Sequence, residues 1–275
     1  MDSPQMTLQE FETFQTLIFR QSGIRVPENK VLLLSNRIRR RLKATGLTDF
    51  QSYLRLLRSP GGQAEWEGLL NVVTTNETSF FRTEKHFEWL QTEFLDDLRE
   101  RHRQGRHAAR ARIWSAACST GEEPYTIALC LAESRHKVPD WKLEVYGTDL
   151  SQDVLTKARA AVFHEQAMAG VPVKLRTRHF TFSSETSCWT AKPTLSSLVS
   201  IARHNLMEPS QERDFDCVFI RNVLIYFSRE SKQAVIDHLV RSLAPGGYLV
   251  VGPSEGIFDM LGMLQKRSTF LYQKV

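Results

Sequence analysis

The sequence predicts an all-helical N-terminal domain followed by an α/β domain, in which a mostly parallel, doubly wound sheet carries a small inserted β-subdomain. Three observations support this fold class. Apolar residues recur every three or four positions up to about Val73. Strands and helices alternate from Ile113 onward. The alternation fails between Pro172 and Arg203, where short Thr-, Ser- and aromatic-rich runs appear. The expected parts are a helical domain over 1–75, a linker and long helix over 76–112, and a domain over 113–275 with its β-subdomain at about 172–204.

The helical domain should contain several amphipathic helices. The first carries apolar residues at helical spacing, namely Leu8, Phe11, Phe14, Leu17 and Ile18. The apolar face of the next is formed by Val31, Leu34, Ile38 and Leu42. Gly46 is placed to end that helix, and Asp49 to cap the following one. Pro60-Gly61-Gly62 then breaks the chain before a helix from about Trp66 to Val73.

The remaining elements follow from length and periodicity. A long helix is expected from about Thr83 to Arg103. The expected strands of the sheet are 113–117, 143–148, 215–220 and 247–252, and the helices that cover it are 122–134, 151–160 and 229–243. The runs His179–Phe182 and Ser200–Arg203 are expected as short strands of the β-subdomain.

Polar residues stand where three of these strands end. The apolar strand that reaches Ile220 stops at Arg221-Asn222, and the chain then continues to Tyr226. The first strand leads to a turn at Gly121, and the second ends at Asp149. Because ligands of open α/β sheets bind beyond the carboxyl ends of the strands, these residues should face one crevice.

The residue types in this crevice favour one class of cofactor. Gly121 lets a ligand approach the backbone, but the next residues, Glu122 and Glu123, would repel a pyrophosphate, which disfavours NAD and ATP. A cofactor with cationic groups, such as S-adenosylmethionine, fits better. The alternative is that both glutamates only complement the helix dipole. Asp149 suits hydrogen bonds to ribose hydroxyls, although it could instead cap the next helix.

Four motifs in this order carry a family resemblance: NETSFFR (76–82), ACSTGEEPYTIAL (117–129), GTDLS (147–151) and RNVLIYF (221–227). The chain resembles the CheR-type chemotaxis receptor methyltransferases from about Phe11 to its last strand. The resemblance implies a class I methyltransferase Rossmann-like fold, with Ser268–Lys274 as its antiparallel edge strand. It also implies methyl esterification of glutamate side chains on chemotaxis receptors, with S-adenosyl-L-methionine as cofactor.

The resemblance further implies roles for particular residues. Arg82 would orient the substrate carboxylate, and Tyr226 would lie near the transferred methyl group; these are the expected catalytic residues. The Asn205-Leu206 pair would lie against the adenine, although an asparagine before Glu208-Pro209 could also serve a turn. The expected cofactor-binding residues are Asn76, Thr78, Arg82, Gly121, Glu122, Asp149, Asn205, Leu206, Arg221 and Asn222. Ile225 and Phe227, by contrast, are expected in the core.

The charge distribution points to a surface for substrate. The net charge is +5, yet the segment from Lys30 to Arg58 holds eight basic residues and one acidic residue. Receptor methylation segments in the family are acidic helices, so Arg37, Arg40 and Arg41 are expected to bind substrate. A solvated charged face is the alternative.

Several other classes of protein are disfavoured. The four cysteines show no metal-ligand spacing, so no metal is expected. The start lacks the features of a signal peptide and no apolar run could span a bilayer, which predicts a cytoplasmic protein without membrane insertion, expected as a monomer. No glycine lies between Gly170 and Gly246, so the glycine-rich loop with which some family members dock a receptor's C-terminal peptide is not expected.

Two alternative functions remain at this point. The pI of about 9.1 would suit a nucleic-acid methyltransferase. However, the chain has no Pro-Pro pair, which an amino-directed base methylase would be expected to carry, so no nucleic-acid partner is expected. A non-catalytic, cofactor-binding signalling adaptor is the other alternative. The presence together of Arg82, Asp149, Arg221 and Tyr226 favours an enzyme.

Overall fold

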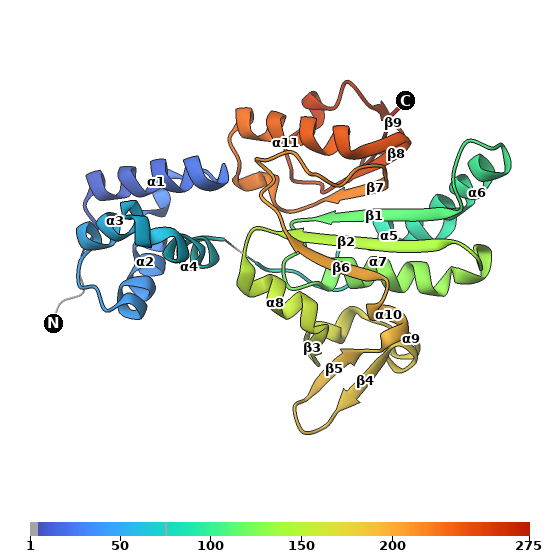
Figure 1. Ribbon diagram of the computed structural model, residues 1–275, viewed down its shortest axis with the longest axis horizontal. Coiled ribbons are helices and arrows are strands. Elements are labelled where there is room, and N and C mark those ends of the chain that lie inside the picture. Colours follow the sequence, from blue (N-terminus) through green and yellow to red (C-terminus); the bar gives the residue numbers. More distant parts are fainter. Residues whose placement is uncertain (1–4, 75) are drawn as a thin grey trace.

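The computed structural model describes residues 5–74 and 76–275, which form a helical domain and a sheet domain side by side (Figure 1). The helical domain contains α1 (Leu8–Ser22), α2 (Val31–Thr45), α3 (Phe50–Arg58) and α4 (Gln63–Val73), with 3-10 turns at Glu28–Lys30 and Pro60–Gly62. The apolar faces predicted from the sequence meet in one core, which includes Phe11, Phe14, Leu34, Ile38 and Tyr53.

The predicted helix ends in this domain are confirmed. Gly46 ends α2 at a φ of 73°, where a residue with a side chain would be strained. Asp49 caps α3, because its carboxylate accepts a hydrogen bond of 2.7 Å from the backbone N–H of Ser52. The expected long helix after the linker is divided into α5 (Glu84–Trp89), a π-helical turn (Leu90–Phe94) and α6 (Leu95–Arg103).

The main sheet has the strand order β6-β2-β1-β7-β8-β10-β9. Its strands are β1 (Arg110–Ala116), β2 (Lys142–Asp149), β6 (Val199–Arg203), β7 (Phe215–Ile220), β8 (Leu243–Val251), β9 (Gln265–Lys266) and β10 (Leu271–Gln273). The first five run parallel, and β10 pairs antiparallel with β8, as expected for the last segment. The sheet is therefore doubly wound, mostly parallel and closed by an antiparallel edge.

Helices cover both faces of this sheet. Figure 1 shows α11 (Arg229–Ser242) on one face, and α7 (Glu122–Glu133) and α8 (Gln152–Ala160) on the other. Two separate apolar cores result, because successive strand residues point to opposite faces. On β1, Ile113 joins one core and Trp114 the other. The short 3-10 turns of the domain are Arg135–Lys137, Ala167–Gly170, Leu224–Tyr226 and Phe258–Met260.

The β-subdomain differs from its prediction in two ways. Its three-stranded sheet has the order β3-β5-β4 and begins before Pro172, with β3 (Val162–His164) preceding β4 (Phe180–Ser183) and β5 (Cys188–Ala191). The run Ser200–Arg203 was expected in this subdomain, but it belongs to β6, which pairs with β2 in the main sheet. The sequence of a short edge strand does not show which sheet the strand joins, because its pairing depends on residues distant in the sequence. The subdomain also includes the helices α9 (Val173–His179) and α10 (Pro193–Ser196).

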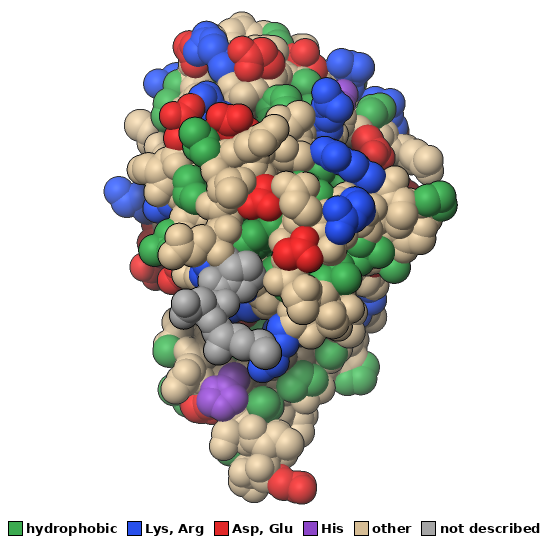
Figure 2. All heavy atoms as spheres, turned by 90° about the vertical axis from the view of Figure 1, so that its left-hand side faces the viewer, with side chains coloured by type: hydrophobic (Ala, Val, Ile, Leu, Met, Phe, Trp, Pro, Cys, Tyr) green, Lys and Arg blue, Asp and Glu red, His purple; other side chains and the backbone are tan. Residues whose placement is uncertain are grey.

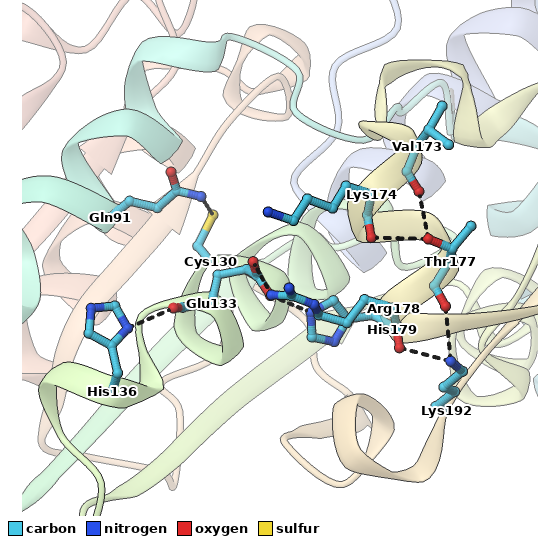
Figure 3. A network of polar contacts seen from close by, with 10 residues as sticks. All are labelled: Gln91, Cys130, Glu133, His136, Val173, Lys174, Thr177, Arg178, His179 and Lys192. Atoms are coloured by element: carbon cyan, nitrogen blue, oxygen red, sulfur yellow. Dashed lines mark hydrogen bonds and ion pairs between the residues drawn. The ribbon is translucent and has the colours of Figure 1, made fainter.

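Glu133 at the end of α7 ties the β-subdomain to the main domain (Figure 3). Its carboxylate lies 2.9 Å from Nη1 of Arg178 and 2.7 Å from Nε2 of His179, both at the end of α9. Lys192 donates to the backbone oxygens of Thr177 and Arg178, at 3.0 and 2.9 Å, and so caps that helix. Helix α9 therefore has a fixed attachment to α7. Within the described residues, no helix is long and apolar enough to cross a membrane.

Candidate active site

An open cavity lies where β1, β2 and β7 end. Its wall combines segments that are far apart in the sequence: the end of α1, residues 73–74 and 76–82, the start of α7, and the loops that follow four strands of the main sheet. The expected crevice at the carboxyl ends of the strands is therefore present. The predicted site residues that line it are Asn76, Thr78, Arg82, Asp149, Asn205, Leu206, Arg221, Asn222 and Tyr226.

Asp149 is the last residue of β2, and only 8% of its surface is exposed. Its carboxylate accepts hydrogen bonds from the backbone N–H groups of Ser119 and Ser151, at 2.9 and 3.0 Å. Burial raises the pKa of this carboxyl group, which the backbone hydrogen bonds oppose. Ser151, and not Asp149, caps α8. Each oxygen of Asp149 keeps a lone pair that can accept a further hydrogen bond from a ligand.

The structure places Glu123, and neither Gly121 nor Glu122, on the cavity wall. Gly121 has a φ of 104°, and a Cβ there would come within 3.1 Å of Ala158, so this glycine permits a close approach of α8. Glu122 is buried, and its carboxylate accepts a 2.6 Å hydrogen bond from the hydroxyl of Thr120. Glu123 is therefore a further candidate for cofactor contact, which the sequence analysis did not select. The expected roles of Gly121 and Glu122 in cofactor binding stay predictions.

Arg221 forms a buried ion pair with Glu123, and its side chain is only 2% exposed. The distance between Nη1 of Arg221 and the Glu123 carboxylate is 2.7 Å, and the other Glu123 oxygen accepts from the hydroxyl of Ser115 at 2.8 Å. Arg221 also donates to the backbone oxygen of Arg82 and lies 5.4 Å above the ring of Phe87. The pair thus joins three parts of the wall in one network.

The backbone of residues 76–82 is fixed to the loop after β1 and to helix α7. The carbonyl oxygen of Asn76 accepts a hydrogen bond from the hydroxyl of Ser119 at 2.9 Å. The N–H of Phe81 donates to the hydroxyl of Thr126 at 3.2 Å. Arg82 is half-buried on the cavity wall, and one of its guanidinium nitrogens donates to the backbone oxygen of Glu77 at 2.9 Å. Its remaining donors are available to a carboxylate.

Asn205 has structural partners within the protein. Its Nδ2 donates to the backbone oxygen of Gln21 at 3.1 Å, and its Oδ1 accepts from the N–H of Met207 at 3.1 Å. The second bond is the turn interaction that was the alternative to adenine recognition. Leu206 lines the cavity beside it and also packs into one of the two sheet cores. The hydrogen bonding of the Asn205 amide to the adenine edge of the cofactor stays a prediction.

The helical domain closes one side of the cavity. Ile24, just after α1, forms an antiparallel bridge with Phe227, and the N–H of Arg25 donates to the backbone oxygen of Tyr226 at 2.8 Å. Ser22 and Ile24 line the cavity, as does Phe227, which also packs against one of the sheet cores, where it was expected. Ile225 was also expected in the core, but it is 44% exposed. These contacts join residues about two hundred positions apart, for which the sequence offers no local signal.

The expected substrate-binding arginines on α2 have different surroundings. Arg41 is held by Glu65 through two hydrogen bonds of 2.8 and 2.9 Å, and Glu65 also accepts from the hydroxyl of Tyr53. Arg41 therefore makes an internal contact of the helical domain, and its expected role in substrate binding stays a prediction. Arg37 is half-buried and donates to the backbone oxygen of Val73. Burial lowers its pKa, and its charge interacts with Tyr226 and with Arg40. Arg40 is exposed.

The charges on the wall fit S-adenosylmethionine. Asp149 and Glu123 can serve a ribose and an ammonium group, and Arg82 and Arg221 can serve a carboxylate. Buried nitrogens without a partner in the protein, Nε of Arg221 and Nε2 of His204, belong to residues of this wall. Over residues 5–74 and 76–275, no three His, Cys, Asp or Glu side chains gather as a metal site.

Comparison with known proteins gives the family. Residues 9–74 match the all-alpha domain of CheR methyltransferases, and residues 76–271 match their SAM binding domain. A chemotaxis protein methyltransferase of Escherichia coli K12 is 34% identical over 270 residues, covering 96% of this chain and 89% of that protein. Chemotaxis protein methyltransferase 2 of Pseudomonas aeruginosa PAO1 is 35% identical, covering 90% and 87%. A chemotaxis protein methyltransferase of Borreliella burgdorferi is 32% identical, covering 92% of this chain and 89% of that protein. The chain therefore belongs to the CheR methyltransferase family and is an S-adenosylmethionine-dependent methyltransferase.

Proposed function

We propose that this protein transfers a methyl group from S-adenosylmethionine to glutamate side chains of chemotaxis receptors, acting as a cytoplasmic monomer on protein and not on nucleic acid. The names of its relatives support a role in chemotaxis. One observation carries the proposal: three carboxylates, of Glu77, Glu123 and Asp149, and two guanidinium groups, of Arg82 and Arg221, meet in one cavity that the helical domain helps to close. This set of charges suits an amino-acid cofactor together with an acidic substrate.

The proposed chemistry requires orientation more than proton transfer. S-Adenosylmethionine supplies a methyl group activated by its sulfonium. The γ-carboxylate of glutamate has a pKa of ~4.3 and is therefore ionised at neutral pH, so it needs no general base. The protein must hold the carboxylate oxygen in line with the methyl carbon. Asp149 would bind the ribose hydroxyls, and Glu123, which lines the cavity beside the predicted Glu122, would face the ammonium group.

Arg82 and Tyr226, which both line the cavity, would orient the reacting groups. The guanidinium of Arg82 offers a planar pair of donors, which matches the geometry of a carboxylate. The hydroxyl of Tyr226 would position the carboxylate or the methyl group, as its backbone is held by Arg25. Neither residue is required to accept or donate a proton in this proposal.

The helical domain would provide the receptor-binding face. Figure 2 looks onto this domain and shows Lys and Arg side chains gathered in a band along one side of it, with acidic side chains among the neighbours. Arg37 connects this face to the cavity, because it donates to the backbone oxygen of Val73, which lines the cavity. An acidic helix bound along α2 would therefore lie close to the site of methyl transfer.

Charge reversal at Arg40 should weaken receptor binding without affecting the cofactor. We expect Arg40→Glu to raise the KM for a receptor signalling fragment roughly tenfold at low salt, and to flatten the dependence of KM on salt. The control is Arg106→Glu, because Arg106 is exposed in the turn after α6, on the opposite side of the molecule from the helical domain (Figure 1). Equal KM values for the two variants would show that the α2 face does not bind the receptor.

The proposed function is tested by methyl transfer from labelled S-adenosylmethionine to purified receptor signalling fragments. Label should appear on a fragment that carries glutamates at its methylation positions. It should not appear on a matched fragment in which alanine replaces those glutamates. Transfer to both fragments alike, or to neither, would contradict the proposal.

A further inference from the structure

Glu255 holds the loop that carries three of the site residues. It follows β8, its side chain is buried, and its exposure is 0%. Its carboxylate accepts hydrogen bonds from two backbone N–H groups of the loop after β7, one from Asn222 and one of 2.8 Å from Leu224. Glu255 does not line the cavity. Its contact with the cavity wall is indirect, through the backbone of the loop after β7.

The surroundings of Glu255 are built around its carboxylate. A Cβ at Gly252 would lie 2.5 Å from Oε1 of Glu255 and 3.3 Å from the backbone nitrogen of Asn222. Glycine at position 252 therefore leaves room for the carboxylate to reach the loop. Lys232 of α11 donates to the backbone oxygen of Glu255 at 2.6 Å and fixes this segment from the other side.

The loop leaves the extended backbone of β7 directly after Ile220. Asn222 has a φ of 57°, in the left-handed region that asparagine tolerates better than most residues with side chains. The N–H groups of this irregular segment are not paired with a neighbouring strand, so they need another acceptor. Two N–H groups, at Asn222 and Leu224, converge on one side chain, so the required partner must offer two acceptors. A carboxylate does so, whereas an amide offers one oxygen and would turn its NH₂ group toward the second N–H.

We propose that Glu255 is a positioning residue for methyl transfer: its carboxylate fixes the loop after β7 and thereby places Arg221, Asn222 and Tyr226 on the cavity wall. The inference deepens the proposed function and rests on it, because the loop carries both cofactor-binding and substrate-orienting residues. The effect of Glu255 on cofactor affinity does not involve the receptor, so it can be tested separately.

The test compares Glu255→Gln with Asp216→Asn. Asp216 is a second buried carboxylate, 1% exposed, at the opposite end of β7; it accepts from the N–H of Arg112 at 2.8 Å and lies 2.7 Å from Nε2 of His107. Both variants should lower the thermal unfolding midpoint. We expect only Glu255→Gln to weaken S-adenosylhomocysteine binding, about tenfold by calorimetry. Only this variant should also lower kcat, by about 100-fold, measured well below both unfolding midpoints.

Wild-type affinity and kcat in Glu255→Gln would overturn the inference. An equal loss in Asp216→Asn would also overturn it, since the effect would then follow from stability alone. Should Glu255→Gln fail to fold, Gly252→Ala takes its place, because the added methyl group displaces the carboxylate; wild-type values in that variant would refute the inference. If the wild-type protein methylates no receptor fragment, the proposed function fails, while the tenfold change in S-adenosylhomocysteine affinity still tests Glu255.

Discussion

Replacing Arg221 by methionine should destabilise the folded protein by about 3–5 kcal/mol, the range for breaking a buried ion pair on one side. The side chains of Arg221 and Glu123 are 2% and 12% exposed, so Glu123 would be left buried with only the hydroxyl of Ser115 as partner. Methionine keeps much of the volume against Phe87, which separates the loss of charge from a loss of packing. The measurement is urea unfolding at neutral pH. Cofactor binding should be lost in the same variant.

A double variant shows whether the loss of stability arises from the broken ion pair between Arg221 and Glu123. Adding Glu123→Gln to Arg221→Met removes the unpaired charge, so part of the lost stability should return. Residues in direct contact show such non-additivity, whereas independent residues do not. Strictly additive effects of the two substitutions would contradict the buried ion pair as the organising contact of the cavity wall.

Replacing Asp149 by alanine should weaken the binding of S-adenosylmethionine by about 1.5–3 kcal/mol, the range for hydrogen bonds to a charged group. The variant also leaves the N–H groups of Ser119 and Ser151 without their acceptor. Titration calorimetry measures the change. The control is Asp153→Ala, which removes an exposed carboxylate from the first turn of α8. Unchanged affinity in a folded Asp149→Ala protein would remove Asp149 from the cofactor site.

The burial of Asp149 also gives a direction for the effect of pH. Burial raises the pKa of this carboxyl group, so it takes up a proton at a higher pH than an exposed aspartate. The protonated form loses acceptor capacity. Cofactor affinity should therefore fall as the pH is lowered, beginning above the usual aspartate range.

Much of the fold could be predicted because local patterns and tertiary contacts agree. Gly46 and Asp49 mark helix ends with short-range chemistry, and β7 is an apolar run buried along its full length. Strand β6 was assigned to the wrong sheet, since Ser200–Arg203 has no local feature that selects a partner strand. Pairing of an edge strand is decided by contacts distant in sequence, here with Val145–Asp149.

The site was predictable where a strand end determines the direction of a side chain. Asp149 and Arg221 lie at such ends, and both line the cavity. The choice between Glu122 and Glu123 depends on the rotation of α7 about its axis, which the turn at Gly121 sets and the sequence does not display. Arg41 looked like a free surface cation because its partner, Glu65, lies on another helix. Glu255 gave no signal, since its role depends on a loop more than thirty residues earlier.

The chemical nature of the transferred label tests the central claim most directly. After methyl transfer to a receptor signalling fragment, the labelled fragment is treated with mild base, and the volatile product is collected. A glutamyl methyl ester predicts that the label leaves as methanol. Label that stays on the fragment in base would indicate methylation of nitrogen or carbon and would contradict the proposed esterification.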